Sequence, residues 1–418
     1  MNKKLALVNI GQLVTLAGSK RPRINKELGN LSIIEDAALI CSGEKIEKVG
    51  KNADLCHEID QDYFEIVDAL GSVVTPGLVD AHTHLVFAGS REKEYEMKIE
   101  GKSYQEIATL GGGIRSTVRS TRDSSEEQLY LEARKHLHML LANGTTTIEA
   151  KSGYGLSVVD ELKILRIIQR LNSQEAVDII ATFLGAHEIP DEYRQDRKSY
   201  IDLIVNEMLP SVAEKKLASY CDIFCESHVF SIEESRYILS AAKQYGFGLR
   251  LHADQLTLSG GAKLAAELGA KTADHLEQIG SEEIALLKEA GVFALLLPGS
   301  VFHLGLKRYP PAREMIESGL AVVIATDFNP GSSPTPSLPM IMSLACTQMR
   351  MTPAEALTAC TINAAYSLDK GDLVGSVEPG KLADLTIFDC KDYRQIPYFF
   401  GANLVKTVIK AGKIAYKC

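Results

Sequence analysis

The sequence predicts an α/β protein with two parts: a (β/α)8 TIM barrel, and a small β-sandwich domain that both ends of the chain build together. Eight apolar, strand-like runs alternate with helix-length segments in the middle of the chain, which is typical of such a barrel. Both ends carry short strand-like runs with turns instead. Histidines and carboxylates gather where the central strands end, which is where barrel proteins build their active sites.

The small domain is predicted from the two ends of the chain. The strand-like runs there are residues 38–41, 45–49, 384–388, 405–409 and 413–416. The first two flank a short polar turn at 42–44, which predicts a hairpin. We therefore expect residues 1–72 and 369–418 to form one β-sandwich domain, and residues 73–368 to form the catalytic barrel.

The barrel is predicted from the alternating pattern between these ends. Its strand-like runs are residues 78–84, 145–150, 178–187, 222–228, 247–254, 271–277, 292–298 and 320–327. Helical patterns lie between them, for example at 126–141, 160–171, 232–245 and 281–290. An open, doubly wound sheet is the alternative, and it is less favoured because no Gly-x-Gly-x-x-Gly follows the first strand. The glycines at 111–113 lack P-loop spacing, so they predict a flexible loop.

Composition excludes several classes of function. The net charge of -9 argues against a general nucleic-acid or anionic-membrane binder. No apolar run approaches the length of a membrane span, and Asn9, Gly11 and Gln12 interrupt the apolar N-terminal segment, which fits a strand better than a signal peptide. The eight cysteines form no C-x-x-C pair, which is typical of reduced cytoplasmic thiols. We expect a soluble cytoplasmic protein that acts on a small molecule.

The most informative motif is PGLVDAHTH at residues 76–84, an apolar strand that ends in His-x-His. Residues two apart in a strand point to the same face, so His82 and His84 can bring two imidazoles to one metal ion. Two histidines alone are weak evidence, since such pairs also occur in packed cores. Similar residues end other strands, namely His187, Glu188, Glu226, His228, His252, Asp254, Gln255, Asp274, His275 and Asp327. Because each buried polar group costs about 1–3 kcal/mol unless satisfied, their concentration predicts a site.

These motifs together resemble the amidohydrolase superfamily. The resemblance includes the PGLVDAHTH opening, a histidine on strands five and six, an aspartate on strand eight, and GKLADL at 380–385 on the return to the small domain. Within that superfamily, the chain is most similar to the imidazolonepropionase family of histidine degradation. The motifs that carry this narrower resemblance are FAGSR (87–91), GGGI (111–114), KSGYG (151–155), LGAHE (184–188), LHADQ (251–255), ADHL (273–276) and ATDFNPGS (325–332).

The resemblance implies a set of functional residues and a cofactor. It implies one divalent metal ion, zinc or iron, whose ligands are His82, His84, His252 and Asp327. It implies catalytic roles for His275, Asp327, Gln255 and His187. The substrate-binding residues that it implies are Arg91, Tyr154, His187, Gln255, Asn329, Gly331 and Ser332. The oligomeric state that it implies is a homodimer.

The implied reaction is hydrolysis of the ring amide C–N bond of 4-imidazolone-5-propanoate, which gives N-formimidoyl-L-glutamate. Asp327 can carry a proton from water to the leaving nitrogen, while His275 orients or deprotonates that water. His187 is expected to hydrogen-bond the carbonyl oxygen or the ring. Arg91 suits the propanoate through a two-pronged contact that a lysine could not reproduce.

Two positions depart from the pattern of relatives. Some relatives carry glutamate where this chain has Gln255, and an amide cannot act as a base, so general-base duty falls to His275 or Asp327. Binuclear relatives often bridge two metals with a modified lysine at the end of strand four, where this chain has Glu226 and no lysine. We therefore expect one metal. His228 lies outside the motif, and we interpret it as a hydrogen-bonded structural residue.

Two alternative functions stay open. The first is another mononuclear amidohydrolase, such as a nucleobase or heterocycle deaminase, which would need a general acid for the departing ammonia where this chain has Gln255. The second is a catalytically silent scaffold protein, which would have lost metal ligands that this chain retains. Metal analysis would separate a scaffold from an enzyme, and product identification would separate the two enzymes.

Overall fold

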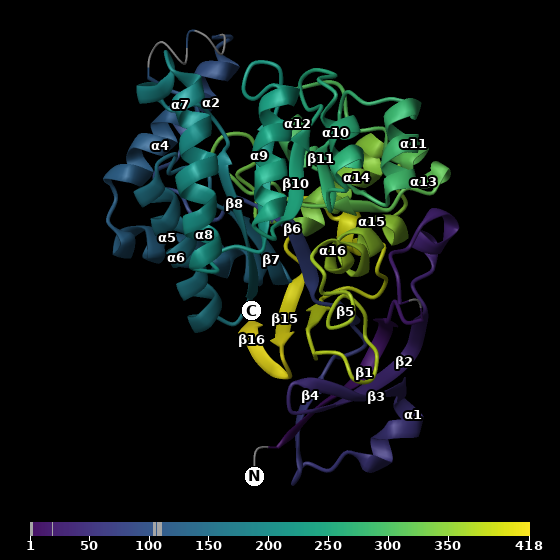
Figure 1. Cartoon of the computed structure of the whole chain (residues 1–418). Coiled ribbons are helices and arrows are strands. Elements are labelled where there is room, and N and C mark those ends of the chain that lie inside the picture. The colour runs from purple at the N-terminus through teal and green to yellow at the C-terminus, as the bar shows by residue number, and fades with distance from the viewer. Residues whose placement is uncertain (1–2, 19, 103–105, 107–110) are drawn as a thin grey trace.

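The computed structural model describes residues 3–18, 20–102, 106 and 111–418, and it consists of a barrel above a smaller sheet (Figure 1). The strands are β1 (Lys4–Val14), β2 (Ile33–Ser42), β3 (Lys45–Lys51), β4 (Phe64–Asp68), β5 (Val73–Pro76), β6 (Leu78–Thr83), β7 (Thr145–Lys151), β8 (Asp178–Ala186), β9 (Tyr220–Cys225), β10 (Gly248–Ala253), β11 (Thr272–His275), β12 (Phe293–Leu296), β13 (Val322–Ile324), β14 (Leu385–Phe388), β15 (Val405–Lys410) and β16 (Lys413–Lys417).

The α-helices are α1 (Asn52–Leu55), α2 (Glu92–Ile99), α4 (Ile114–Asp123), α5 (Glu126–Ala142), α6 (Val158–Gln174), α7 (Arg197–Leu203), α8 (Leu209–Glu214), α9 (Ile232–Gln244), α10 (Gly261–Leu268), α11 (Ser281–Ala290), α12 (Pro298–His303), α13 (Ala312–Ser318), α14 (Leu338–Met349), α15 (Pro353–Ala359), α16 (Ile362–Ser367) and α17 (Gln395–Tyr398). Short 3-10 turns lie at η1 (Asn25–Gly29), η2 (Cys56–Glu58) and η3 (Asp191–Tyr193), and a π-helical turn, η4 (Ile204–Met208), joins α7 to α8.

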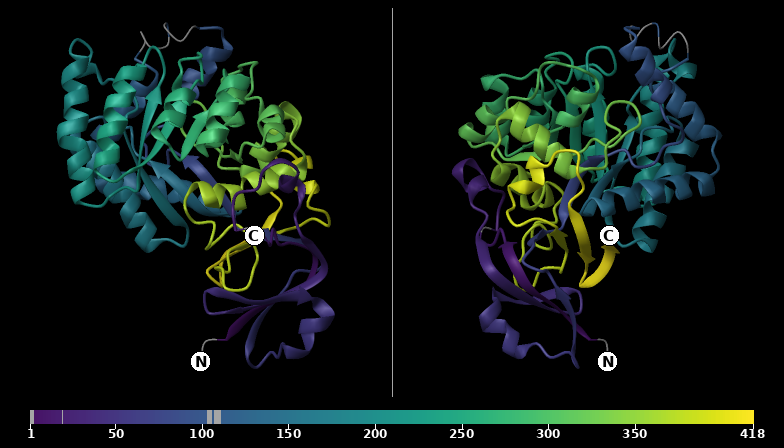
Figure 2. Two further views of the ribbon diagram at one scale, coloured as in Figure 1. Left: turned by 45° about the vertical axis from the view of Figure 1, so that its right-hand side comes forward. Right: turned by 180° about the vertical axis from the view of Figure 1, so that it is seen from behind.

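The barrel consists of β6 to β13, which pair in chain order and in parallel within the described residues. Backbone hydrogen bonds next to the last strand close it: the Asp327 N–H donates to the His82 carbonyl (3.0 Å), and the His84 N–H donates to the Phe328 carbonyl (2.9 Å). Helices cover the outside of the strands (Figures 1 and 2). The predicted (β/α)8 barrel, with its eight strands, is confirmed.

The small domain is one connected sheet built from both ends of the chain, as predicted. Its strands follow the order β16-β15-β14-β5-β1-β2-β3, with β4 paired to β1. The purple N-terminal and yellow C-terminal strands lie together in Figure 1. Side chains from both halves, such as Leu7 of β1 and Ile387 of β14, meet in one apolar cluster. The sheet therefore curves around its own core, which gives it the layered character of the predicted sandwich.

Local sequence explains where the barrel helices begin and end. Ser125 before α5 and Ser231 before α9 each accept a hydrogen bond from a backbone N–H three residues on, and a Gln or Glu side chain returns the bond. These capping boxes satisfy N–H groups that have no partner inside the helix. Gly269 and Gly291 end α10 and α11 with φ values of 66° and 70°, a conformation that glycine adopts without strain.

Several barrel strands are shorter than the sequence predicts, and two of them end at or just before predicted site residues. The run 271–277 contains a strand only to His275, where φ is 80°, and Leu276 follows with φ of 68°. The run 320–327 contains only β13, and Asp327 has φ of 53°. A left-handed backbone cannot continue a strand, because it turns the chain out of the pleat. The strands therefore stop where the predicted site residues begin.

The small sheet covers the amino ends of the barrel strands. The Lys410 ammonium of β15 donates to Asp178 at the start of β8 (2.6 Å) and to Asp384 before β14 (2.5 Å). The Thr386 hydroxyl donates to the carbonyl of Gly144, directly before β7 (2.9 Å). The carboxyl ends of the strands are thus left open for a site. We propose the domain bounds 1–72, 73–368 and 369–418. The strand β5 (Val73–Pro76), just after the first bound, is hydrogen-bonded to β1 and β14 of the small sheet.

No helix among the described residues is long and apolar enough to span a membrane.

We predict that the Lys410 contact stabilises the joint between the sheet and the barrel. The variant Lys410→Met leaves the buried carboxylate of Asp384 without its cation, and it should lower the free energy of unfolding by about 2–3 kcal/mol. Urea unfolding, followed by circular dichroism, measures this. Lys413→Met, an exposed residue on the neighbouring strand, is the matched control, and equal midpoints for the two variants would refute the prediction.

Candidate metal centre and active site

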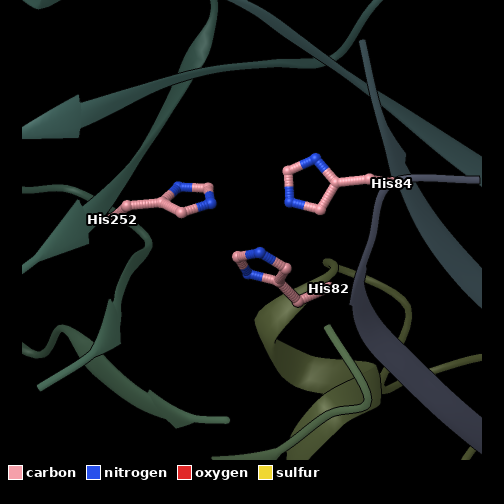
Figure 3. A group of neighbouring side chains, drawn as sticks. All are labelled: His82, His84 and His252. Atoms are coloured by element: carbon pink, nitrogen blue, oxygen red, sulfur yellow. The ribbon is translucent and has the colours of Figure 1, made fainter. Parts of the chain in front are cut away.

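Three buried histidines converge at the carboxyl end of the barrel. His82 lies on β6, His84 follows it, and His252 lies on β10. Their ligand-capable nitrogens lie within 4.8 Å of one another, and Figure 3 shows the three rings turned toward a common centre. His82 Nε2 and His252 Nε2 are buried without a hydrogen-bond partner among the described residues, and His84 Nε2 lies beside the Asp327 carboxylate (3.5 Å). Unpartnered buried nitrogens are costly, so their convergence next to a third imidazole fits a metal ion.

Asp327 lies beside this cluster, as its predicted role as fourth ligand requires. One carboxylate oxygen lies 3.6 Å from His82 Nε2 and 3.5 Å from His84 Nε2. Burial opposes ionisation of this carboxyl, but its contacts with His84 and His275 outweigh burial and lower its pKa. The site thus combines three imidazoles with one anionic oxygen, a donor set that suits zinc and iron.

His82 and His84 are held as neutral imidazoles, the form that binds a metal. Burial lowers the pKa of His84, and it lowers the pKa of His82 well below the ordinary value; neighbouring Lys151 adds to the effect at His82. Burial also lowers the pKa of His187, whose Nδ1 lies 2.9 Å from the Gly153 carbonyl. A protonated imidazole has no free lone pair on nitrogen, so these shifts keep the donors available near neutral pH.

A buried layer of charge orients two of the histidines from below. Asp274 contacts His82 Nδ1 (2.7 Å), and Asp222 lies 3.0 Å from His252 Nδ1. The Lys151 ammonium lies 2.7 Å from Asp222 and 3.7 Å from Asp274. Sequence reasoning named Asp274 without this role, quoted Lys151 only as part of the KSGYG motif, and gave Asp222 no functional role. Their signal was available, because both are charged residues inside apolar strands.

A cavity of about 520 Å³ opens above the histidine cluster. Its lining residues are His84, Arg91, Lys98, Ile114, Tyr154, His187, Phe224, His228, His252, Gln255, Leu256, His275, Leu304, Leu306, Asp327, Asn329, Gly331 and Ser332. Except for His82, all predicted site residues are in this lining. Another cavity, of about 710 Å³, opens near the amino ends of the strands, and its lining among the described residues includes no histidine.

His275 and Gln255 lie on the same side of this cavity. His275 Nδ1 lies 3.4 Å from the buried carboxylate of Glu277. Burial opposes protonation of His275, but Glu277 outweighs burial and raises its pKa. The main-chain carbonyl of Gln255 accepts a hydrogen bond from the Gln278 side-chain amide (3.2 Å). His275 therefore has a fixed carboxylate partner on one nitrogen, which leaves its other nitrogen for a molecule in the cavity.

The opposite wall carries the predicted substrate contacts. The Glu94 carboxylate holds the Arg91 guanidinium: Glu94 Oε2 accepts a hydrogen bond from Arg91 Nε (2.9 Å) and lies 2.8 Å from Arg91 Nη2. A side chain at Gly331 would put its Cβ 2.1 Å from Arg91 Nη1 and would displace the guanidinium from its present position. Asn329 accepts hydrogen bonds from the Gly331 and Ser332 N–H groups, both at 2.8 Å, and fixes their loop. Tyr154 is buried beside the His84 ring.

Several residues outside the proposed set differ from expectation. His228 is exposed at the cavity, its ring lies beside the Phe224 ring, and it makes no hydrogen bond within the described residues. Glu226 accepts from the Leu256 and Thr257 N–H groups and so fixes the loop after β10. Gly113, expected in a flexible loop, is the N-cap of α4, with φ of 84°.

Comparison with known proteins agrees with this geometry. Residues 73–415 match the amidohydrolase family. An imidazolonepropionase from Solibacter usitatus (strain Ellin6076) is 55% identical over 412 residues, which cover 99% of this chain and 98% of that protein. An imidazolonepropionase from Shouchella clausii (strain KSM-K16) is 48% identical over 417 residues, which cover 99% and 93%.

Solved structures support the fold. The E. coli guanine deaminase superimposes over 100% of both chains with a TM-score of 0.74, at 17% sequence identity. That identity is too low to carry function. The family match and the identity of 55% to a full-length relative lead to one conclusion: the chain belongs to the amidohydrolase family and, within it, to the imidazolonepropionases.

Proposed function

We propose that this protein hydrolyses the ring amide C–N bond of 4-imidazolone-5-propanoate and releases N-formimidoyl-L-glutamate. The observation that carries the proposal is the arrangement of one cavity. Its floor holds the cluster of His82, His84 and His252, and one wall holds Arg91, a cation suited to a carboxylate. A metal-activated water and a carboxylate anchor are the two elements that ring opening of this substrate needs.

We propose that His82, His84, His252 and Asp327 hold one divalent metal, zinc or iron. When bound, that metal supplies a Lewis acid that polarises the ring carbonyl and lowers the pKa of water toward about 7. The unpartnered Nε2 atoms of His82 and His252, and the approach of the three rings within 4.8 Å, support this assignment. Asp222 and Asp274 fix the ring orientations, as carboxylates behind metal-binding histidines usually do.

The proton transfers are assigned to Asp327 and His275. Asp327 accepts the proton of the attacking water and passes it to the leaving ring nitrogen. His275, held by Glu277, hydrogen-bonds the same water and orients it toward the carbonyl carbon. His187 hydrogen-bonds the substrate ring: its Nδ1–H donates to the Gly153 carbonyl, so the neutral imidazole accepts at Nε2 from a ring N–H.

The remaining residues bind and orient the substrate. Arg91 directs Nη1 to the loop of Gly331 and binds the propanoate there. Tyr154 packs against the imidazolone ring, and the amide of Gln255 hydrogen-bonds a ring nitrogen. Asn329 and Ser332 contact the substrate from the loop that follows Asp327, where the Ser332 hydroxyl lies 3.5 Å from the Asp327 carboxylate.

We also propose a cytoplasmic homodimer. The eight cysteines, all free thiols in the structure, support a reducing compartment. The side chains of Tyr398 and Phe400, each 75% exposed, form an apolar surface that supports self-association.

The identity of the product tests the proposed function. Incubation with 4-imidazolone-5-propanoate should yield a product one water heavier that retains both ring nitrogens, because hydrolysis opens the ring and releases no fragment. Mass spectrometry and an ammonia assay on one sample measure this. Ammonia released in step with substrate loss would identify a deaminase and overturn the proposal.

Asp327→Asn tests the proton carrier. The amide retains nearly the size of the carboxylate but cannot accept a proton, so kcat should fall by about 100-fold or more. Metal content is measured on the same preparation, because the substitution also removes ligand charge. Asp389→Asn, at an exposed position, is the control. Wild-type kcat in a metal-loaded Asp327→Asn variant would remove Asp327 from the proton pathway.

Lys151→Met tests the charge layer beneath the metal. Without the ammonium, Asp222 and Asp274 repel each other and orient His82 and His252 poorly, so metal affinity should fall by about 10- to 100-fold. Competition with a zinc chelator measures affinity, and wild type should bind about one equivalent per chain. Lys215→Met is the exposed control. Asp222→Asn repeats the test without changing side-chain size; wild-type affinity in both folded variants would contradict the prediction.

A further inference from the structure

The cavity has one strongly basic end. Among the residues that line it, Arg91 and Lys98 are permanent cations, while Asp327 is the one carboxylate and lies at the metal end. Both cations come from α2 and the residue before it. Burial, Lys98 and Arg91 together lower the pKa of nearby His303, which reflects the positive potential at this end.

The charge of Arg91 is already balanced within the protein. Glu94 contacts two of its nitrogens, Nε at 2.9 Å and Nη2 at 2.8 Å. Glu94 is itself fixed, because the Ser116 hydroxyl donates to its other oxygen (3.1 Å). Ser116 lies in the first turn of α4, next to the Gly111–Gly113 segment. The Arg91–Glu94 pair is neutral overall and offers a substrate hydrogen bonds from Nη1 rather than net charge.

Lys98 has no such balance. It lies four residues after Glu94 on α2, a spacing that would allow an ordinary helix ion pair, but Glu94 is turned toward Arg91. Within the described part of the chain, no carboxylate oxygen lies within 4.0 Å of the Lys98 ammonium. Its side chain is half-buried in the cavity wall. A half-buried cation without a partner is unfavourable unless an anion enters the cavity.

We propose that Lys98 is a specificity-determining residue: it supplies the net positive charge that selects a substrate carboxylate, while Arg91, held by Glu94, supplies the directional hydrogen bonds. The two tasks are separate. The Lys98 ammonium contributes a positive charge whose hydrogen bonds have no fixed direction, whereas the Arg91 guanidinium, neutralised by Glu94, contributes hydrogen bonds of fixed direction and no net charge. The inference rests on the proposed function for the identity of the substrate. It does not rest on that function for the class of ligand, which is a small ring compound with a carboxylate side chain.

Two ligands that differ only in charge test the role of Lys98. The probes are 3-(imidazol-4-yl)propanoate and its uncharged amide, whose binding to metal-loaded protein is measured by calorimetry. Lys98→Met should weaken binding of the propanoate by about 5- to 10-fold and leave binding of the amide unchanged. Lys98→Arg should restore most of the affinity. Lys93→Met, which removes an exposed lysine of the same helix, should match wild type.

Turnover of 4-imidazolone-5-propanoate by the same variants separates this inference from the proposed function. Lys98→Met should raise KM and leave kcat within about twofold, because the charge acts equally on the ground state and the transition state. If Lys98→Met lost the same affinity for the propanoate and for the amide, Lys98 would have a structural role and the inference would be overturned. The inference would also be overturned if Lys98→Met bound the propanoate as tightly as Lys93→Met does. If wild type shows no turnover but still prefers the propanoate through Lys98, the proposed function fails and the inference stands.

Discussion

The active site depends on the buried ammonium of Lys151. It lies against three carboxylates, those of Glu149, Asp222 and Asp274, in a region fully removed from solvent. Without a cation, three carboxylates so close together would not remain ionised, because burial and mutual repulsion both favour the neutral acids. With it, two of them stay in place to orient metal-binding rings. The Lys151 ammonium, which does not line the cavity, thus helps to fix the orientation of the His82 and His252 rings.

The barrel explains why these residues can meet. Parallel pairing from β7 to β11 aligns the strand ends, so that residues from distant parts of the sequence share one layer. The left-handed backbone at His275 and Asp327 then turns both side chains out of the strand pattern. Such conformations are unfavourable for non-glycine residues and persist where the surrounding structure enforces them. At Asp327 the hydrogen bond from its own N–H that closes the barrel holds the backbone, and after His275 the Leu276 N–H donates to the Ala253 carbonyl (3.1 Å).

Much of this architecture is predictable from the sequence, because its determinants are local. Apolar runs that alternate with helix-length segments identify the eight strands, and the His82-x-His84 pair identifies the first part of the metal cluster. Other features are not local. Glu94 follows Arg91 by three residues and reads as an ordinary helix pair, and its anchor, Ser116, lies on another helix. The Lys151 layer joins three strands, so only the fold reveals it. The glycines at 111–113 lie in a loop, as predicted, but that Gly113 caps α4 is visible only in the structure.

The seam of the barrel has a consequence for how the protein responds to its metal. His82 lies on the first barrel strand, His84 directly follows it, and Asp327 follows the last strand, so the proposed ligands lie on both sides of the seam. A bound ion would act as a crosslink across it, and its binding energy would add to the stability of the closed barrel. Chelation should therefore loosen the seam before the rest of the fold, and amide hydrogens near residues 82–84 and 327–328 should become the first to exchange.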